Sequence, residues 1–328
     1  MLPTFKLPYV EYAELALDII APFVTTYFLF LLQRPVFHKN LRILLAHFSI
    51  SLGLMTLLRI AILVDSMTSR LMLGGHGTFW VHLFHNGFVL ALLDASVLMA
   101  GERFIATIFV DRYELVSFWP ITVAMCAVMT GINMYISYYT LLRGQNAVLT
   151  PSGEFSLDHA QYNMDIINSL IVLTVLNVIG VLSFFLLYVF NQKRWKHDRD
   201  RKLGHRYQIA ENMKTSKQLL IVLLANLVIS IYLFFVLYYM LAVKRKTRFT
   251  ETLSQFFDLV AASAAIMLPV LFIKMHPKLQ DVVRSHLLLS RVSNSKCVAP
   301  AGNEEANVYF NELAKSWSVK EKPCIVVR

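Results

Sequence analysis

The chain has 328 residues, of which 56% are hydrophobic and only 16% are charged. Soluble domains carry roughly 25% charged residues, so this composition excludes an ordinary water-soluble protein and indicates lipid as the solvent. The net charge of +10 does not indicate nucleic-acid binding, because the basic residues lie between apolar stretches and near the C-terminus, as in cytoplasmic segments of membrane proteins.

Seven apolar stretches are long enough to cross a bilayer as helices, which takes roughly 20 residues each. In chain order they are 12–32, 41–64, 81–109, 118–142, 166–190, 219–243 and 256–273. They predict an all-α fold, a seven-transmembrane helix bundle of the G-protein-coupled receptor type, over residues 12–275. Residues 1–11 form a short N-terminal segment before it.

The distribution of Lys and Arg predicts the orientation of this bundle. With the N-terminus outside, the inner segments carry about twice as many basic residues as the outer ones, most of them in 191–217. The cluster at 244–248 is the exception on the outer side. The positive-inside rule therefore favours a multi-pass plasma-membrane protein with an extracellular N-terminus and a cytoplasmic C-terminus.

Two further segments come after the seventh stretch. Apolar residues recur near helical spacing in 276–289, which predicts a short amphipathic helix on the inner membrane surface. Residues 290–328 are polar and are expected to form a mobile cytoplasmic tail. Cys297 in this tail is a candidate for lipidation, with an unmodified thiol as the alternative.

The third apolar stretch runs directly into Glu102-Arg103, and we expect its helix to be the axis of the bundle. Glu102 lies ~22 residues after Trp80, or about 33 Å along a helix, which matches the thickness of the bilayer. An Arg at this inner end can exchange carboxylate partners and act as a switch. The alternative is that the pair simply marks the point where the helix meets water.

Asp111-Arg112-Tyr113 matches the triplet of rhodopsin-like receptors. It lies two or three turns beyond Glu102, so we expect 111–114 to be loop and not part of the third helix. The segment 205–212 precedes the sixth stretch, and its Glu211 is a candidate partner for Arg103. Alternatively, this segment is a solvated helix start whose basic residues contact lipid head groups.

The motifs ERFIAT at 102–107, RYQIAEN at 206–212 and HP at 276–277 together resemble the nematode serpentine chemoreceptors. The class epsilon (Sre) group of the Sra-like superfamily is the closest fit, and the class alpha-beta (Srab) group is a near second. The resemblance covers the seven stretches. It implies a chemosensory receptor that couples to a heterotrimeric G protein. The implied coupling and switch residues are Glu102, Arg103, Arg206, Tyr207, Glu211 and Asn212.

A pocket between the outer halves of the helices suits a small organic ligand or odorant, because aromatic walls with a few polar groups are typical of such sites. The candidate ligand-binding residues are Phe84, His85, Phe88, Asn168, Thr174, Tyr238, Tyr239 and Asp258. For each of them ordinary packing is the alternative, and for Asp258 it is contact with outer water. Asp94, deeper in the third stretch, is expected to bond to a neighbouring helix.

The sequence contains no phosphate-binding Gly-rich loop, zinc-protease motif or hydrolase elbow. It therefore predicts neither an enzyme nor a cofactor or metal site. The predicted partners are a heterotrimeric G protein, a small-molecule ligand and membrane lipids, and not nucleic acid. Two other classes stay open: a ligand-gated channel with the N-terminus inside, and a small-solute transporter, which the lack of internal repeats disfavours.

Overall fold

The computed structural model describes residues 8–34, 37–68, 73–109, 119–148, 157–197, 203–242 and 248–289. No strand occurs in these ranges. Cys297 and the expected tail at 290–328 lie outside them, as do residues 1–7. The described helices are α1 (Pro8–Leu32), α2 (Lys39–Met67), α3 (Gly74–Ile108), α4 (Trp119–Val148), α5 (Leu157–His197), α6 (Leu203–Ala242), α7 (Arg248–Met275) and α8 (Pro277–Leu289).

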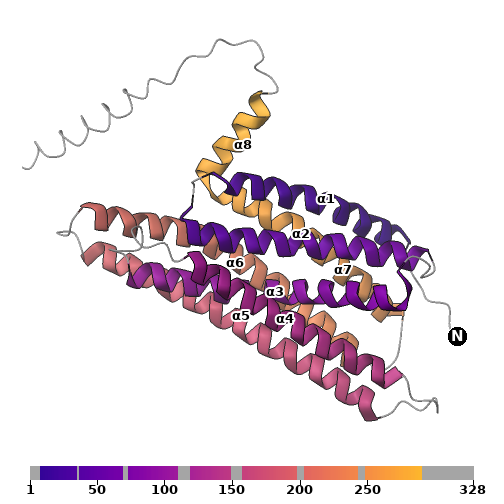
Figure 1. Cartoon of the computed structure of the whole chain (residues 1–328). Helices are drawn as coiled ribbons and strands as arrows, with labels where there is room; N and C mark the ends of the chain where they lie inside the picture. Colours follow the sequence, from indigo (N-terminus) through magenta and orange to yellow (C-terminus); the bar gives the residue numbers. More distant parts are fainter. Residues whose placement is uncertain are drawn as a thin grey trace, which may run out of the picture. The chain divides into compact units, whose positions relative to one another are not determined.

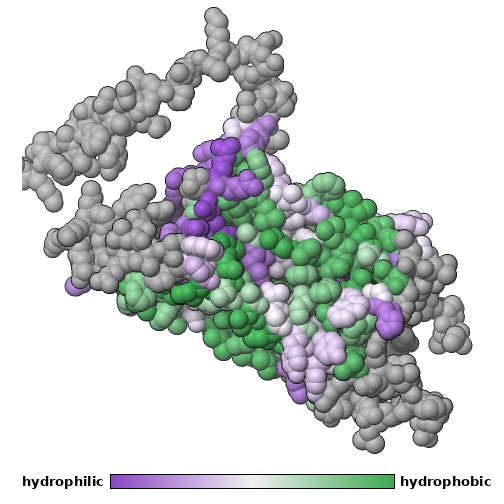
Figure 2. Space-filling view, viewed as in Figure 1, coloured by the Kyte–Doolittle hydropathy of each residue, from purple (hydrophilic) through white to green (hydrophobic). Residues whose placement is uncertain are grey.

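Helices α1 to α7 lie side by side as a bundle (Figure 1). Each of these seven is long and apolar enough to cross a membrane. Large apolar side chains such as Phe23, Val228 and Phe235 point away from the bundle and are exposed, and hydrophobic residues cover the middle of the face shown in Figure 2. A surface of this kind is stable against lipid, so the predicted seven-transmembrane fold is confirmed.

Helix α3 is the most deeply placed of the seven. It packs against α2, α4, α5 and α6. Buried residues make up 56% of its most apolar window, compared with 22–39% in the other six helices. The expectation that the third helix is the axis of the bundle is confirmed.

Buried polar side chains connect α3 to its neighbours. Asn133 of α4 donates its Nδ2 to Asp94 Oδ2 at 2.7 Å, as expected for an interhelical bond of Asp94. Ser96 Oγ donates to Asn177 Oδ1 of α5 at 2.7 Å. Asn226 of α6 donates to a backbone carbonyl of α3 at 3.1 Å. Inside a membrane such groups have no water to bond with, so each bond selects the neighbour and its rotation.

Several helices extend past the apolar stretches that predicted them. The stretches at 118–142 and 166–190 predicted helices that are too short, because α4 continues through Gly144 to Val148 and α5 begins at Leu157. Likewise, α5 runs to His197 and α6 begins at Leu203, beyond the ends of the apolar stretches at 166–190 and 219–243. Hydropathy marks where a helix leaves the hydrocarbon, and a helix can continue into water. The basic residues in the last turn of α5 suit the negative end of its dipole.

Gly180 of α5 lies directly against the backbone of α3. A Cβ at this position would lie 2.6 Å from Ser96 Oγ and 2.8 Å from the backbone nitrogen of Val97. A backbone atom cannot move aside as the end of a side chain can. The two helices therefore approach each other closely only because residue 180 has no side chain, as is common at helix contacts in membranes.

This contact predicts that Gly180→Ala destabilises the protein by about 1–3 kcal/mol, the usual cost of overpacking, despite the better helix propensity of Ala. Gly131→Ala is the matched control, since nothing lies within 4 Å of a Cβ at that position of α4. Thermal unfolding in detergent measures both variants. Equal midpoints for the two would contradict the close approach.

Candidate functional site

The C-terminal end of α3 carries a buried pair of charges. Arg103 donates its Nε to Glu102 Oε2 at 2.5 Å and its Nη2 to Glu102 Oε1 at 2.9 Å. Both residues are only 4% exposed. Charges that simply met water at a helix end would be exposed, whereas burial of this pair has a desolvation cost that is offset by the two-point contact. The pair is thus held inside the bundle, where a change of partner can alter packing.

The last turns of α3 are also bonded to α5. Thr107 Oγ1 donates to the Arg103 carbonyl at 2.8 Å and accepts from Asn191 Nδ2 at 2.9 Å. Arg194 Nη1 donates to the Thr107 carbonyl at 3.0 Å. Two side chains of α5 therefore hold the segment of α3 that carries Arg103. The sequence analysis did not identify Asn191 or Arg194, because a single polar residue at the end of an apolar stretch gives no signal.

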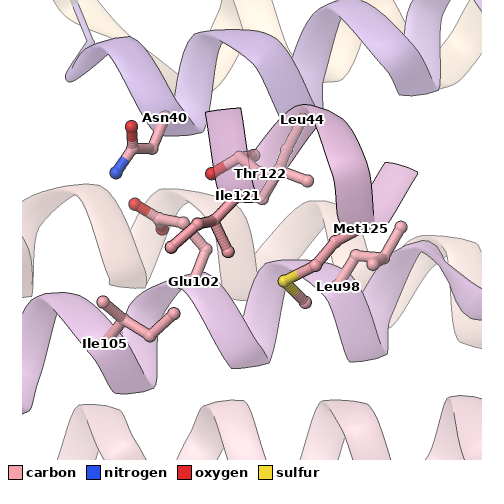
Figure 3. Close-up of a pocket in the computed structure, with 8 residues that line it drawn as sticks. All are labelled: Asn40, Leu44, Leu98, Glu102, Ile105, Ile121, Thr122 and Met125. Carbon is pink, nitrogen blue, oxygen red and sulfur yellow. The ribbon is translucent and has the colours of Figure 1, made fainter. Parts of the chain in front are cut away.

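A small cavity of about 30 Å³ lies next to Glu102, between α2, α3 and α4 (Figure 3). Asn40 near the start of α2 and Thr122 of α4 contribute polar groups to its lining. Asn40 is 2% exposed, and its Oδ1 has no hydrogen-bond partner. The volume and the polar atoms suit a single water molecule and not an organic ligand. The Glu102 carboxylate therefore borders a mostly apolar cavity with two polar neighbours, and Figure 3 shows it directed towards Asn40.

The predicted inner motif before the sixth stretch lies in the first turns of α6. Arg206, Tyr207, Glu211 and Asn212 are helical, but their side chains lie outside the described part of the structure. A contact between Glu211 and Arg103 accordingly stays a prediction. Helix α3 ends at Ile108, before the triplet at 111–113, which falls in the undescribed range 110–118.

His276 connects α7 to α8. Its carbonyl accepts the backbone N–H groups of Leu279 and Gln280 at 3.0 and 3.1 Å, and Pro277 occupies the first helical position, where its missing N–H is no loss. The imidazole is buried against the edge of Phe37, and its Nδ1 has no hydrogen-bond partner. Burial, and secondarily the positive charges of Lys214 and Lys278, lower the pKa of His276 to about 4.

The half of the bundle opposite to Glu102-Arg103 contains a cluster of charges on three helices. Arg59 of α2 bonds Glu14 of α1 at 2.7 Å and Asp258 of α7 at 2.5 Å. Asp18, one helical turn after Glu14 in α1, is 1% exposed, and its Oδ2 has no hydrogen-bond partner. Among the described residues no group of His, Cys, Asp and Glu side chains could hold a metal ion. The positive charge of Arg59 thus compensates the carboxylates of Glu14 and Asp258, and its two ion pairs connect α2 to α1 and α7.

A larger cavity of about 400 Å³ lies beside this cluster. Side chains from α2, α3, α4, α5, α6 and α7 line it. The polar lining residues are Arg59, His82, His85, Asn86, Ser137, Thr140, Ser169 and Asp258. Apolar residues such as Val89 of α3 and Leu237 of α6 form the rest of the wall. Its size and mixture of groups are typical of small-molecule sites.

The structure brings together two of the eight predicted ligand-binding residues. His85 and Asp258 line the large cavity. The other six, Phe84, Phe88, Asn168, Thr174, Tyr238 and Tyr239, do not line it, and their contact with a ligand stays a prediction. Glu14 and Asp18 were missed as parts of this site. Two acids four residues apart in an apolar stretch, as in Glu14 and Asp18, were a signal that could have been used.

The Glu102-Arg103 pair, the α6 motif and the seven-helix bundle all point to a serpentine receptor. Residues 82–318 match the family described as serpentine type 7TM GPCR receptor class ab chemoreceptor. The chain belongs to this family. No curated protein matches it.

Membership of this chemoreceptor family confirms the resemblance to serpentine chemoreceptors. The matching group is class ab, which the sequence motifs placed second, and the class epsilon assignment is not confirmed. The match and the seven apolar helices make the chain a multi-pass membrane protein. A family of chemoreceptors points to a receptor and not to an enzyme.

The environment of His276 predicts a pH-dependent stability. Its pKa is about 4 in the folded protein and roughly 6.5 in an unfolded chain, so the unfolded state binds the proton first as the pH falls. The stabilisation is complete above about pH 6.5 and is lost towards pH 4. Between pH 7 and pH 5 the loss is about 2 kcal/mol.

Thermal unfolding of the wild type and of His276→Gln in detergent at pH 7 and pH 5 tests this expectation. The wild type should lose more stability than the variant over this range. His197→Gln, at an exposed position of α5, controls for the loss of a histidine. The same pH dependence in the wild type and in His276→Gln would contradict the assignment.

Proposed function

We propose that this class ab serpentine receptor is a chemosensory receptor of the plasma membrane that binds a small molecule in its outer half and activates a heterotrimeric G protein at its inner face. The family match over residues 82–318 carries the proposal, because it includes the inner motifs, most of α3 and helices α4 to α7. The cavity of about 400 Å³ supplies a ligand site on the side of the N-terminal end of α3. The buried Glu102-Arg103 pair supplies a switch at its opposite end.

Signalling in this proposal is a shift between two arrangements of the helices. A ligand favours one of them only to the extent that it binds it more tightly. In the active arrangement the inner ends of α5 and α6 move away from α3 and expose Arg103 to the G protein. The bonds from Asn191 and Arg194 to Thr107 hold α5 in the resting position, so they must break during activation.

This restraint predicts that Asn191→Leu raises basal signalling several-fold at equal surface expression, because the resting state loses a buried interhelical hydrogen bond worth about 1 kcal/mol. Second-messenger output in transfected cells measures the effect. Ser49→Ala is the matched control, since it removes a buried hydrogen bond between α2 and α1, away from α5. Arg103→Ala shows how much of the output depends on the arginine. Unchanged basal output in Asn191→Leu would contradict this mechanism.

The proposed orientation predicts that an epitope placed before Met1 is stained on intact, unpermeabilised cells, and that an epitope after Arg328 is stained only after permeabilisation. The physical reason is the excess of basic residues on the segments assigned to the cytoplasm. A ligand-gated channel with inverted topology would give the opposite pattern. Staining of the C-terminal epitope on intact cells would therefore exclude the receptor proposal.

A further inference from the structure

Two hydroxyl groups on the wall of the outer cavity already donate their protons to carbonyl groups of the protein. Ser137 Oγ donates to the Leu83 carbonyl at 2.8 Å, and Thr140 Oγ1 donates to the Ser137 carbonyl at 2.9 Å. Both residues line the cavity. A hydroxyl has one hydrogen and two lone pairs, so these two side chains offer a ligand hydrogen-bond acceptors and no donor.

His85 also offers the ligand a hydrogen-bond acceptor and no donor. Its Nδ1 lies 3.1 Å from the Met55 carbonyl oxygen, which can only accept a hydrogen bond, so Nδ1 carries the proton. In the neutral imidazole the other nitrogen, Nε2, is then an acceptor. His85 lines the cavity and adds a third acceptor to its wall.

The charges beside the cavity favour a cation over an anion. Arg59 is the only basic side chain of Lys or Arg type among the described residues that line it, and it is already bonded to Glu14 and Asp258. Asp18 interacts electrostatically with the same three groups. Three carboxyl groups thus surround one guanidinium. An anionic ligand would have to displace a carboxylate from Arg59 and would then lie beside the displaced charge.

We propose that the outer cavity binds organic amines, with the ammonium group against Asp258 and the acceptor atoms of His85, Ser137 and Thr140. An ammonium has several N–H donors and no acceptor, which complements this wall. The apolar part of the ligand lies against residues such as Val89 and Leu237. The inference rests on the proposed receptor function, since it names the ligand class of that site.

Thermal unfolding of the purified full-length receptor in detergent tests the ligand class without any G protein. The probes are hexylamine and 2-phenylethylamine, each compared with the alcohol and the carboxylate of the same apolar part. Binding to the folded state raises the unfolding midpoint in proportion to occupancy. The amines should raise the midpoint with concentration, and the matched alcohols and carboxylates should have little effect.

Two substitutions around the same arginine locate the ammonium. Asp258→Asn removes a carboxylate that lines the cavity, whereas Glu14→Gln removes the other partner of Arg59, which does not line it. Loss of a charged hydrogen-bond partner should raise the amine concentration needed for half-maximal stabilisation about tenfold or more in Asp258→Asn. Glu14→Gln should raise it by much less. If Asp258→Asn is not recovered folded, Val89→Phe, which fills the cavity, should abolish the amine effect.

Several outcomes would overturn the amine assignment. These are equal or larger stabilisation by the alcohols or carboxylates, no stabilisation by either amine, or an amine effect that survives both Asp258→Asn and Val89→Phe. Failure of the receptor proposal would look different. It would show as unchanged signalling in Asn191→Leu and as inverted epitope staining, neither of which depends on the ligand.

Discussion

A polar group buried within a lipid bilayer must find its hydrogen-bond partner inside the protein, and this constraint positions the helices of the bundle. Apolar faces alone do not choose between neighbours, because lipid tails are as apolar as leucine. Asp94, Ser96 and Asn226 make that choice, since each bonds across to or from α3. They fix the rotation of α4, α5 and α6 about the central helix, and everything at the two ends of α3 depends on that rotation.

The same helix serves both candidate sites. His85 lies on the wall of the larger cavity, and Arg103 lies 18 residues later, about 27 Å along the helix. Both sites are bonded to other helices: His85 lies 3.1 Å from the Met55 carbonyl oxygen of α2, and Thr107 accepts a hydrogen bond from Asn191 of α5. The bilayer therefore separates two polar regions that share one rigid element, which is the arrangement a transmembrane receptor requires.

Composition and the local sequence were sufficient to predict the seven helices and the interhelical bond of Asp94. Apolar length predicted the seven helices, and an acid deep in an apolar stretch predicted an interhelical partner for Asp94. Pairings between distant residues, such as Arg59 with Asp258 or Thr107 with Asn191, could not be predicted, because no local pattern specifies which helices become neighbours. Helix ends were misplaced for a different reason, since hydropathy reports the boundary of the hydrocarbon and not of the helix. The motifs identified the serpentine superfamily, but were too short to separate class ab from class epsilon.

The contact between Gly180 and Ser96 lies midway between the two polar ends of α5. Gly180 lies 11 residues before Asn191 and 11 residues after Ser169, so about 16 Å of rigid helix extends on either side of it. One arm ends at the cavity wall and the other at the bonds to Thr107. The backbone of α3 leaves no room for α5 to move closer at Gly180. If α5 tilts about this contact in the proposed activation, the arms at Ser169 and Asn191 move in opposite directions.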